Sequence, residues 1–189
     1  MTPQVWRLKG TLLRLTCPLF YRKIGRRTSF AGRIRFPMPF RNVSIGDDCM
    51  IGDAVFIQTG KTSTIEIGNN CSINSGCHIV ASEKIEIGDS VAIGEFVSIR
   101  DQDHKFTPTQ GVRDLGFKVS PIKIGPNCWI GRGVHICPGA SIGSGSIVAA
   151  NSVVKGVFPK NVLLAGAPAV IKRHINPDGS LIKPNATDK

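Results

Sequence analysis

A short stretch near the middle of the chain, Asp-Gln-Asp-His at residues 101–104, has the residue types of acid–base chemistry. Imidazole exchanges protons close to neutral pH, which makes histidine the side chain most often used as a general base. A neighbouring carboxylate fixes the tautomer of such a histidine and stabilises its cation, so Asp101 and Asp103 are the candidate partners of His104. From residue types alone, a structural role for His104 stays open.

The element that must position these side chains is a repeat of six residues. Aliphatic residues recur at this interval from Ile45 to Val154, with one long interruption. The positions are Ile45, Ile51, Ile57, Ile67, Ile73, Ile79, Ile87, Ile93, Ile99, Ile124, Ile130, Ile136, Ile142, Val148 and Val154. This period is wrong for an amphipathic helix, whereas it fits a coil of three short strands per turn with one inward side chain each. The sequence predicts a parallel β-solenoid, with a degenerate first turn starting at Ile24.

Two residue columns support this arrangement. One column is glycine, which is used where the backbone turns sharply or needs a positive φ; its members are Gly46, Gly68, Gly88, Gly125 and Gly143. Cysteines that share the fifth position of a hexad are expected to be small buried side chains; they are Cys49, Cys71, Cys77 and Cys128. Cysteines used in this way fit a reducing cytoplasm.

The interruption of the repeat, residues 100–121, is the expected place for chemistry. A long loop on a rigid scaffold frequently carries function. His104 lies at the start of this loop, whereas His78 and His135 end hexads two turns apart and His174 lies after the last repeat. His104 is therefore the candidate base, and the other histidines are assigned structural or surface roles.

These motifs resemble the hexapeptide-repeat acyltransferases of the sugar and xenobiotic type. The matching segments are PIKIGPNCWIGRGVHICPGASIGSGSIVAANSVV at residues 121–154 and AGAPAVIKRH at residues 165–174, within a resemblance that covers residues 24–175. The resemblance implies an all-β fold, a left-handed parallel β-helix of about five to six coils. It also implies acetyl-CoA as acyl donor, no metal, and a homotrimer.

In this family a DxDH-like segment supplies the catalytic base. The resemblance implies that His104 removes a proton from an acceptor hydroxyl, whose oxygen attacks the thioester while backbone N–H groups stabilise the oxyanion. Asn74 stands in the column of Gly52, Gly94 and Gly131. By resemblance Asn74 contacts the acceptor or assists the histidine of a neighbouring subunit. The alternative is that asparagine tolerates a left-handed backbone there.

The resemblance also implies that the long arm of CoA lies along the C-terminal coils, between two subunits. The matching positions are Trp129, Gly131, Arg132, Gly139, Ala150, Lys155 and Arg173. Trp129 could equally be an exposed interface ring, and Lys155 and Arg173 could be solvated charges. Val170 departs from the pattern, because related sugar acetyltransferases often have arginine there.

The charge of the chain is concentrated at its start. The 189 residues carry a net charge of +11 and have the length of one domain. The basic residues that precede the first acid, Asp47, are Arg7, Lys9, Arg14, Arg22, Lys23, Arg26, Arg27, Arg33, Arg35 and Arg41. The rest is nearly neutral, so we expect no nucleic-acid partner. No apolar run is long enough for a membrane span, and no signal peptide is evident.

Residues 1–23 form a basic amphipathic segment before the acyltransferase domain at 24–175. Its apolar residues at helical spacing are Val5, Leu8, Leu12 and Leu15. They predict a short helix that Pro18 ends. This helix either caps the open bottom of the solenoid or, with the basic residues of 1–41, contacts an anionic membrane from the cytoplasmic side. Residues 176–189 are expected to be a frayed polar tail.

The function that the sequence predicts is acetyl-CoA-dependent O-acetylation of a sugar hydroxyl. The carbohydrate acceptor would belong to a surface polysaccharide, a lipid-linked glycan or a nucleotide sugar. The alternatives are serine O-acetylation, amino-sugar N-acetylation and a non-catalytic solenoid interaction protein. The serine enzymes usually carry a helical N-terminal domain, for which residues 1–23 are too short. A γ-class carbonic anhydrase would need a His-x4-His pair, and no histidines here have that spacing.

Overall fold

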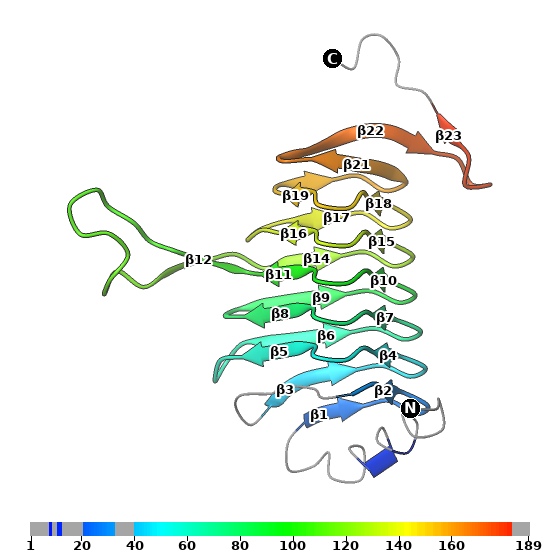
Figure 1. Cartoon of the computed structure of the whole chain (residues 1–189), viewed down its shortest axis with the longest axis horizontal. Helices are drawn as coiled ribbons and strands as arrows, with labels where there is room; N and C mark the ends of the chain where they lie inside the picture. Colours follow the sequence, from blue (N-terminus) through cyan, green and yellow to red (C-terminus); the bar gives the residue numbers. More distant parts are fainter. Residues whose placement is uncertain (1–7, 9–10, 13–20, 33–39, 183–189) are drawn as a thin grey trace.

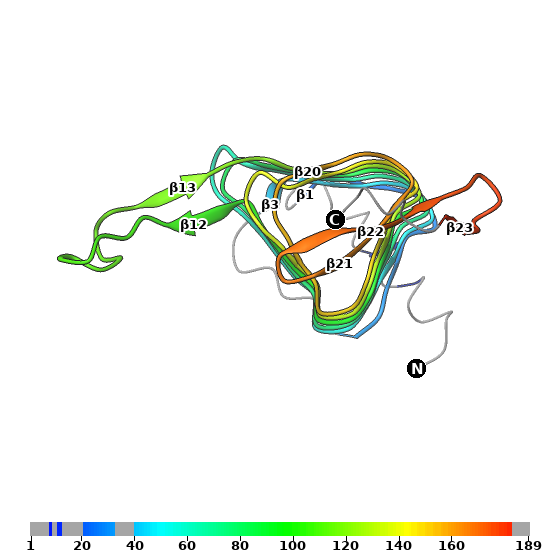
Figure 2. The same ribbon diagram turned by 90° about the horizontal axis from the view of Figure 1, so that it is seen from above.

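Three parallel sheets form the faces of a triangular prism in the computed structural model, which describes residues 8, 11–12, 21–32 and 40–182 (Figure 1 and Figure 2). Each turn adds one short strand to each sheet, so strands from successive turns lie side by side. From residue 21 onward the described chain is all-β and winds through about six turns. The predicted solenoid is confirmed, and its left-handed winding stays a prediction.

The three faces are named in the order in which the chain visits them. The first face contains β1 (Tyr21–Ile24), β3 (Phe40–Ile45), β6 (Thr64–Ile67), β9 (Lys84–Ile87), β14 (Ile122–Ile124), β17 (Ser141–Ile142) and β20 (Val157–Phe158). The second contains β2 (Ser29–Phe30), β4 (Met50–Ile51), β7 (Ser72–Ile73), β10 (Ala92–Ile93), β15 (Trp129–Ile130), β18 (Ile147–Val148) and β21 (Val162–Gly166). The third contains β5 (Phe56–Thr59), β8 (His78–Ala81), β11 (Ser98–Arg100), β16 (His135–Ile136) and β19 (Val153–Val154).

The core is a stack of aliphatic side chains inside the prism. Every aliphatic position of the predicted repeat is buried, with at most 4% of its surface exposed. Parallel pairing keeps the stack in register, so that Ile45 lies beside Ile67 and Ile67 beside Ile87. Each such side chain contributes ~1.5–3 kcal/mol by burial. Ile24 and Phe30 are also buried, which confirms the predicted first turn.

The glycine column is not explained by a positive φ. None of its members has one, and the left-handed residues of these turns lie two positions later, as at Asp48 and Asn70. A Cβ atom added to Gly46 would lie 2.5 Å from the carbonyl oxygen of Gly68 in the next turn. The column is glycine because successive turns pack backbone against backbone at this corner.

The four cysteines at the fifth position of a hexad are buried as predicted. The thiol of Cys77, for example, donates to the Gly94 carbonyl oxygen at 3.0 Å. Burial raises the pKa of Cys77 to about 11. Cys137 differs because its side chain is only partly buried.

We expect iodoacetamide at pH 8 to alkylate Cys137 at least roughly tenfold faster than Cys77 in the native protein, because the thiolate is the reactive form and burial suppresses both access and ionisation. Mass spectrometry of the digested protein measures both rates. In guanidinium chloride the two rates should become similar. Equal rates in the native protein would contradict the buried arrangement.

Little of the predicted N-terminal helix lies within the described residues. Leu8, Thr11 and Leu12 have helical backbone, and the rest of 1–20 is outside them. Two cations assigned to membrane contact are paired with acids, Arg26 with Asp47 at 3.7 Å and Arg27 with Asp48 at 2.5 Å. In the described ranges, no helix is long and apolar enough to cross a membrane.

The C-terminal end of the solenoid is formed by strands that reverse direction. β22 (Ala169–Ile175) pairs antiparallel with β21, and β23 (Leu181–Ile182) pairs antiparallel with β22. The first part of the predicted frayed tail is therefore ordered, because β23 returns to pair with β22. Ser180 donates to Asp178 through its hydroxyl and its backbone N–H, which lowers the pKa of that carboxyl.

Candidate active site

The predicted loop is a hairpin that projects from the prism (Figure 1 and Figure 2). Its strands are β12 (Gln102–His104) and β13 (Phe117–Val119), which pair antiparallel, and a further bridge joins Thr107 to Gly111 near the tip. The hairpin connects β11 of the third face to β14 of the first face. It therefore leaves the molecule at the edge between these two faces.

His104 is carried outward on this hairpin. Its side chain is exposed, and its ring packs against Phe117, with ring centroids 4.4 Å apart and planes inclined by 44°. Phe117 is its direct partner across the two strands. Within the described residues, no carboxylate hydrogen-bonds the His104 ring. The imidazole is thus held on an apolar support with its nitrogen atoms available to another group.

Asp101 anchors the root of the hairpin. Its side chain is fully buried, and its carboxylate accepts hydrogen bonds from the backbone N–H groups of Ser82, Glu83 and Lys84, at 2.7, 2.7 and 2.9 Å. The next residue, Gln102, contacts the Ser82 hydroxyl. The carboxylate of Asp101 is occupied by the preceding turn of the solenoid, so it positions the hairpin and does not orient the imidazole.

Asp103 points away from His104. Successive side chains of a strand lie on opposite faces, so these neighbours face opposite sides of the hairpin. Burial raises the pKa of the Cys137 thiol, the negative charge of Asp103 raises it further, and Lys155 opposes the shift. Asp103 and Lys155 therefore lie near Cys137, at the root of the hairpin. Neither aspartate is placed to orient His104 within one chain.

A groove of about 530 Å³ runs along the edge between the second and third faces, and we call it the edge groove. Its lining residues are Asn74, Gly94, Glu95, Trp129, Gly131, Arg132, Ile147, Val148, Ala149 and Ala150. Five predicted site residues are among them: Asn74, Trp129, Gly131, Arg132 and Ala150. The structure brings these together from three of four successive turns, those of β7, β15 and β18.

The shape of the edge groove follows from its residue types. Small residues at Gly94, Gly131 and Ala149 leave the backbone accessible along its length. Trp129 is 57% exposed on the second face and forms a wall. Asn74 does not have a positive φ, and the left-handed residue of its turn is Gly76. The backbone explanation for Asn74 is therefore wrong, and its side chain lies at the groove.

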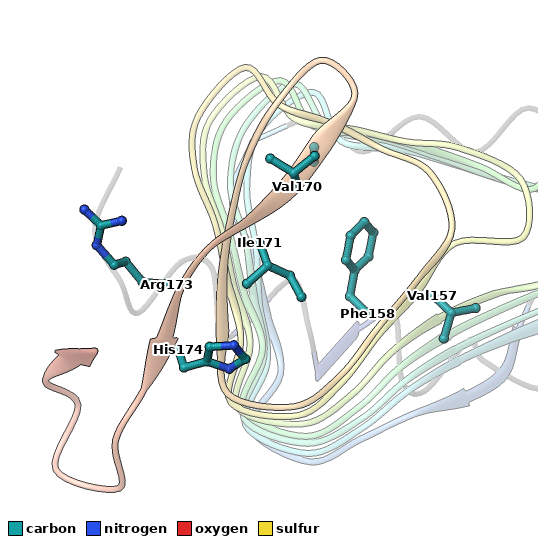
Figure 3. A pocket seen from close by; sticks show the side chains of 7 residues that line it. Val157, Phe158, Val170, Ile171, Arg173 and His174 are labelled. Carbon is teal, nitrogen blue, oxygen red and sulfur yellow. The ribbon is translucent and has the colours of Figure 1, made fainter. Parts of the chain in front are cut away.

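The remaining predicted residues lie elsewhere. Gly139 packs at the hairpin root, where an added Cβ would lie 2.9 Å from the Ser120 hydroxyl oxygen. Lys155 is also at this root, as its effect on Cys137 indicates. Arg173 lines a second cavity of about 500 Å³ at the C-terminal end, where Figure 3 shows its side chain directed away from Phe158. The structure does not bring these three residues to the edge groove.

Comparisons with known proteins place the fold and the motifs in one family. Family models match residues 121–156, as bacterial transferase hexapeptide (six repeats), and residues 42–81, as hexapeptide repeat of succinyl-transferase. A putative lipopolysaccharide biosynthesis O-acetyl transferase, WbbJ of Escherichia coli, is 31% identical over 159 residues, which are 78% of this chain and 81% of the relative. The chain belongs to the hexapeptide-repeat acyltransferase family. As a member of this family it is an acetyltransferase.

Further relatives of this acyltransferase agree. The putative colanic acid biosynthesis acetyltransferase WcaF of Escherichia coli is 30% identical over 173 residues, 91% of this chain and 78% of the relative. A solved galactoside acetyltransferase in complex with coenzyme A has a TM-score of 0.63 and 26% identity, over 93% of this chain and 84% of that one. A Vibrio cholerae acetyltransferase, VCA0836, complexed with acetyl coenzyme A, has a TM-score of 0.56 and 25% identity, over 92% and 88%.

Five lining residues of the edge groove were not predicted as site residues, namely Gly94, Glu95, Ile147, Val148 and Ala149. Glu95 and Gly94 line the edge groove beside Asn74. The repeat contained the signal, since Glu95 occupies the same position of its hexad as Arg132 and Ala150. A column comparison would have added both residues to the predicted site.

Proposed function

We propose that this acyltransferase transfers the acetyl group of acetyl-CoA to a hydroxyl of a sugar, with His104 as general base. The observation that carries the proposal is the edge groove, which gathers Asn74 with four of the positions assigned to the CoA arm. The relatives named for lipopolysaccharide, colanic acid and galactoside acetylation favour a carbohydrate acceptor.

The edge groove suits an extended arm with amide groups. Its small residues leave the backbone accessible to the amides of the arm, although the N–H groups of Gly94, Gly131 and Ala149 already donate to the next turn. Trp129 and Ile147 offer apolar contact. Arg132 adds a positive charge for phosphate. Gly131 lets the next turn pack closely beneath the groove, since an added Cβ would lie 2.6 Å from the backbone nitrogen of Ala150.

The reaction is a direct transfer. His104 accepts the proton of the acceptor hydroxyl as its oxygen bonds to the thioester carbonyl carbon. The carbonyl oxygen becomes an oxyanion, which backbone N–H groups of the groove stabilise. The carbon–sulfur bond then breaks, and the sulfur takes the proton from the imidazolium, so CoA leaves as a thiol. Asn74 holds the acceptor or the imidazole through its side-chain amide.

The complete site forms between copies of the chain. The hairpin leaves the edge between the third and first faces, whereas the groove follows the edge between the second and third faces. These are different edges of one prism, so His104 and Asn74 belong to separate sites of a single chain. A homotrimer would place the hairpin of each chain over the groove of the next. We place the enzyme in the cytoplasm, where acetyl-CoA and glycan precursors are made, and leave membrane contact to residues 1–41.

The proposal is tested with the purified protein, acetyl-CoA and a panel of acceptors. The panel holds methyl glycosides, nucleotide sugars, a lipid-linked glycan, L-serine and glucosamine. Release of free thiol gives the rate, and mass spectrometry locates the acetyl group on oxygen or nitrogen. We expect turnover with sugar hydroxyls. Faster turnover with serine, or acetylation of the glucosamine nitrogen, would support the alternatives, and failure to bind acetyl-CoA in calorimetry would contradict the whole proposal.

Filling the edge groove should block the donor without harming the fold. Ala150→Phe places a large ring at the exposed rim of the groove, and we expect the Kd for acetyl-CoA to rise at least about tenfold, the effect of losing about 1.4 kcal/mol of binding. The Tm should change little, since the position is exposed. Val157→Phe, on the exposed first face, is the matched control. Unchanged affinity in Ala150→Phe would place the donor elsewhere.

A further inference from the structure

Phe96 occupies a turn position whose backbone conformation is unfavourable for a bulky side chain. This residue lies between β10 and β11, has a φ of 57°, and is 67% exposed. The same turn position in other coils has a positive φ and a small or polar residue, at Ala54, Gly76, Gly133 and Asn151. A bulky residue is rarely found in this conformation. Both the backbone conformation and the exposed ring oppose folding, which is the pattern of a residue retained for function.

The ring of Phe96 lies against Gly76, one position beyond the groove-lining residue Glu95. A Cβ atom added to Gly76 would lie 2.5 and 2.6 Å from two ring carbons, so the ring packs directly on that glycine. Gly76 is two residues from Asn74, and the Phe96 backbone N–H donates to the Ser75 carbonyl oxygen at 3.0 Å. The preceding residue, Glu95, lines the groove itself. An exposed aromatic ring therefore packs on the turn that contains Asn74, and the next residue back along the chain, Glu95, shares the groove with Asn74.

We infer that Phe96 is a stacking platform that selects a pyranose ring as the acceptor. One face of a pyranose carries C–H groups, which pack on an aromatic ring, while its hydroxyl groups can donate to the Glu95 carboxylate. An acyclic polyol also carries hydroxyl groups but has no such face. The inference rests on the proposed function and specifies its acceptor: a sugar presented as a closed ring, with the ring beside Asn74.

The test compares a methyl pyranoside with the alditol of the same sugar, starting with methyl β-D-galactopyranoside and galactitol. Phe96→Asn removes the ring and inserts the residue type found at Asn151 of the same column, so the turn is preserved. We expect the ratio of kcat/KM for pyranoside over alditol to fall about tenfold in this variant. Acetyl-CoA affinity should not change, and the Tm should stay at or above that of the wild type.

Two controls isolate the ring. Phe96→Tyr keeps an aromatic surface and should keep the wild-type ratio. Ala54→Asn makes the same kind of change at a turn two coils away and should leave the ratio unaltered. An unchanged ratio in Phe96→Asn would overturn the inference. So would a change in its oligomeric state by light scattering, since the ring would then serve subunit contact. A wild-type protein that acetylates no sugar of the panel would instead contradict the proposed function.

Discussion

Replacing His104 with alanine is expected to lower kcat for acetyl transfer by about 10²–10⁴-fold, which is the usual contribution of a positioned general base. Affinity for acetyl-CoA should change little, because His104 is assigned to the acceptor hydroxyl, whereas the residues assigned to the CoA arm line the edge groove. The Tm should also hold, since the imidazole is exposed. Stopped assays of acetylated product, with calorimetry for the donor, measure the two effects separately.

His78→Ala and His135→Ala are the matched controls. Both histidines are exposed on the third face, and neither is among the residues that line the edge groove. We expect near wild-type turnover from both. Near wild-type turnover from His104→Ala would remove the assigned base.

The His104→Ala variant can also test whether one site contains residues from two chains. Co-expression of His104→Ala with Asn74→Ala produces mixed assemblies in which some sites combine an intact histidine from one chain with an intact asparagine from another. In a trimer with random mixing, about a quarter of the sites should be complete. Recovered activity supports a site between chains. A site confined to one chain would show no recovery, because every chain carries one of the two substitutions.

Replacing Asp101 with alanine should have the largest effect on stability among the polar residues of the site. It would remove the fully buried carboxylate that accepts from three backbone N–H groups, those of Ser82, Glu83 and Lys84. A hydrogen bond to a charged group contributes about 1.5–3 kcal/mol, so the loss of three such bonds should lower the free energy of unfolding by about 3–5 kcal/mol once water replaces part of them, as measured by urea denaturation. Activity should fall even below the Tm, because the hairpin that carries His104 loses its anchor.

Asp103→Ala is the control variant, because it removes a negative charge from the hairpin without removing the anchor at its root. This aspartate is exposed on the same hairpin, so its removal should change the free energy of unfolding by less than about 0.5 kcal/mol. Limited proteolysis should cut the hairpin faster in Asp101→Ala than in Asp103→Ala. Equal stability of the two variants would contradict the anchoring role.

The fold could be predicted from the sequence because the repeat gives equivalent side chains the same packing environment in every turn. An inward position such as Ile79 has the same surroundings as Ile57 below it and Ile99 above it, so one residue type recurs. The hexad positions therefore identified both the strands and the core. Asn74 and Gly131 share one column of the repeat, but their assignment to a site came from the family resemblance.

The roles of Asp101 and Asp103 could not be predicted in this way. Both belong to a segment outside the repeat, where the direction of a side chain depends on the local path of the backbone. The Asp101 carboxylate accepts from three backbone N–H groups of the preceding turn. No pattern in the neighbouring sequence predicts that these groups are its donors. The strain at Phe96 was equally hidden, because the composition of a turn does not report its φ angle.

The reversed strands at the C-terminal end set the length of the stack. In a parallel solenoid the last coil presents a row of unpaired backbone groups, which is a template for one more coil from another molecule. β22 covers this row on the second face in the antiparallel direction, and β23 continues the reversal. A further parallel coil cannot follow an antiparallel one in register there. The antiparallel strand β22 thus opposes end-to-end growth into a fibre, and the side faces of the prism stay free for assembly.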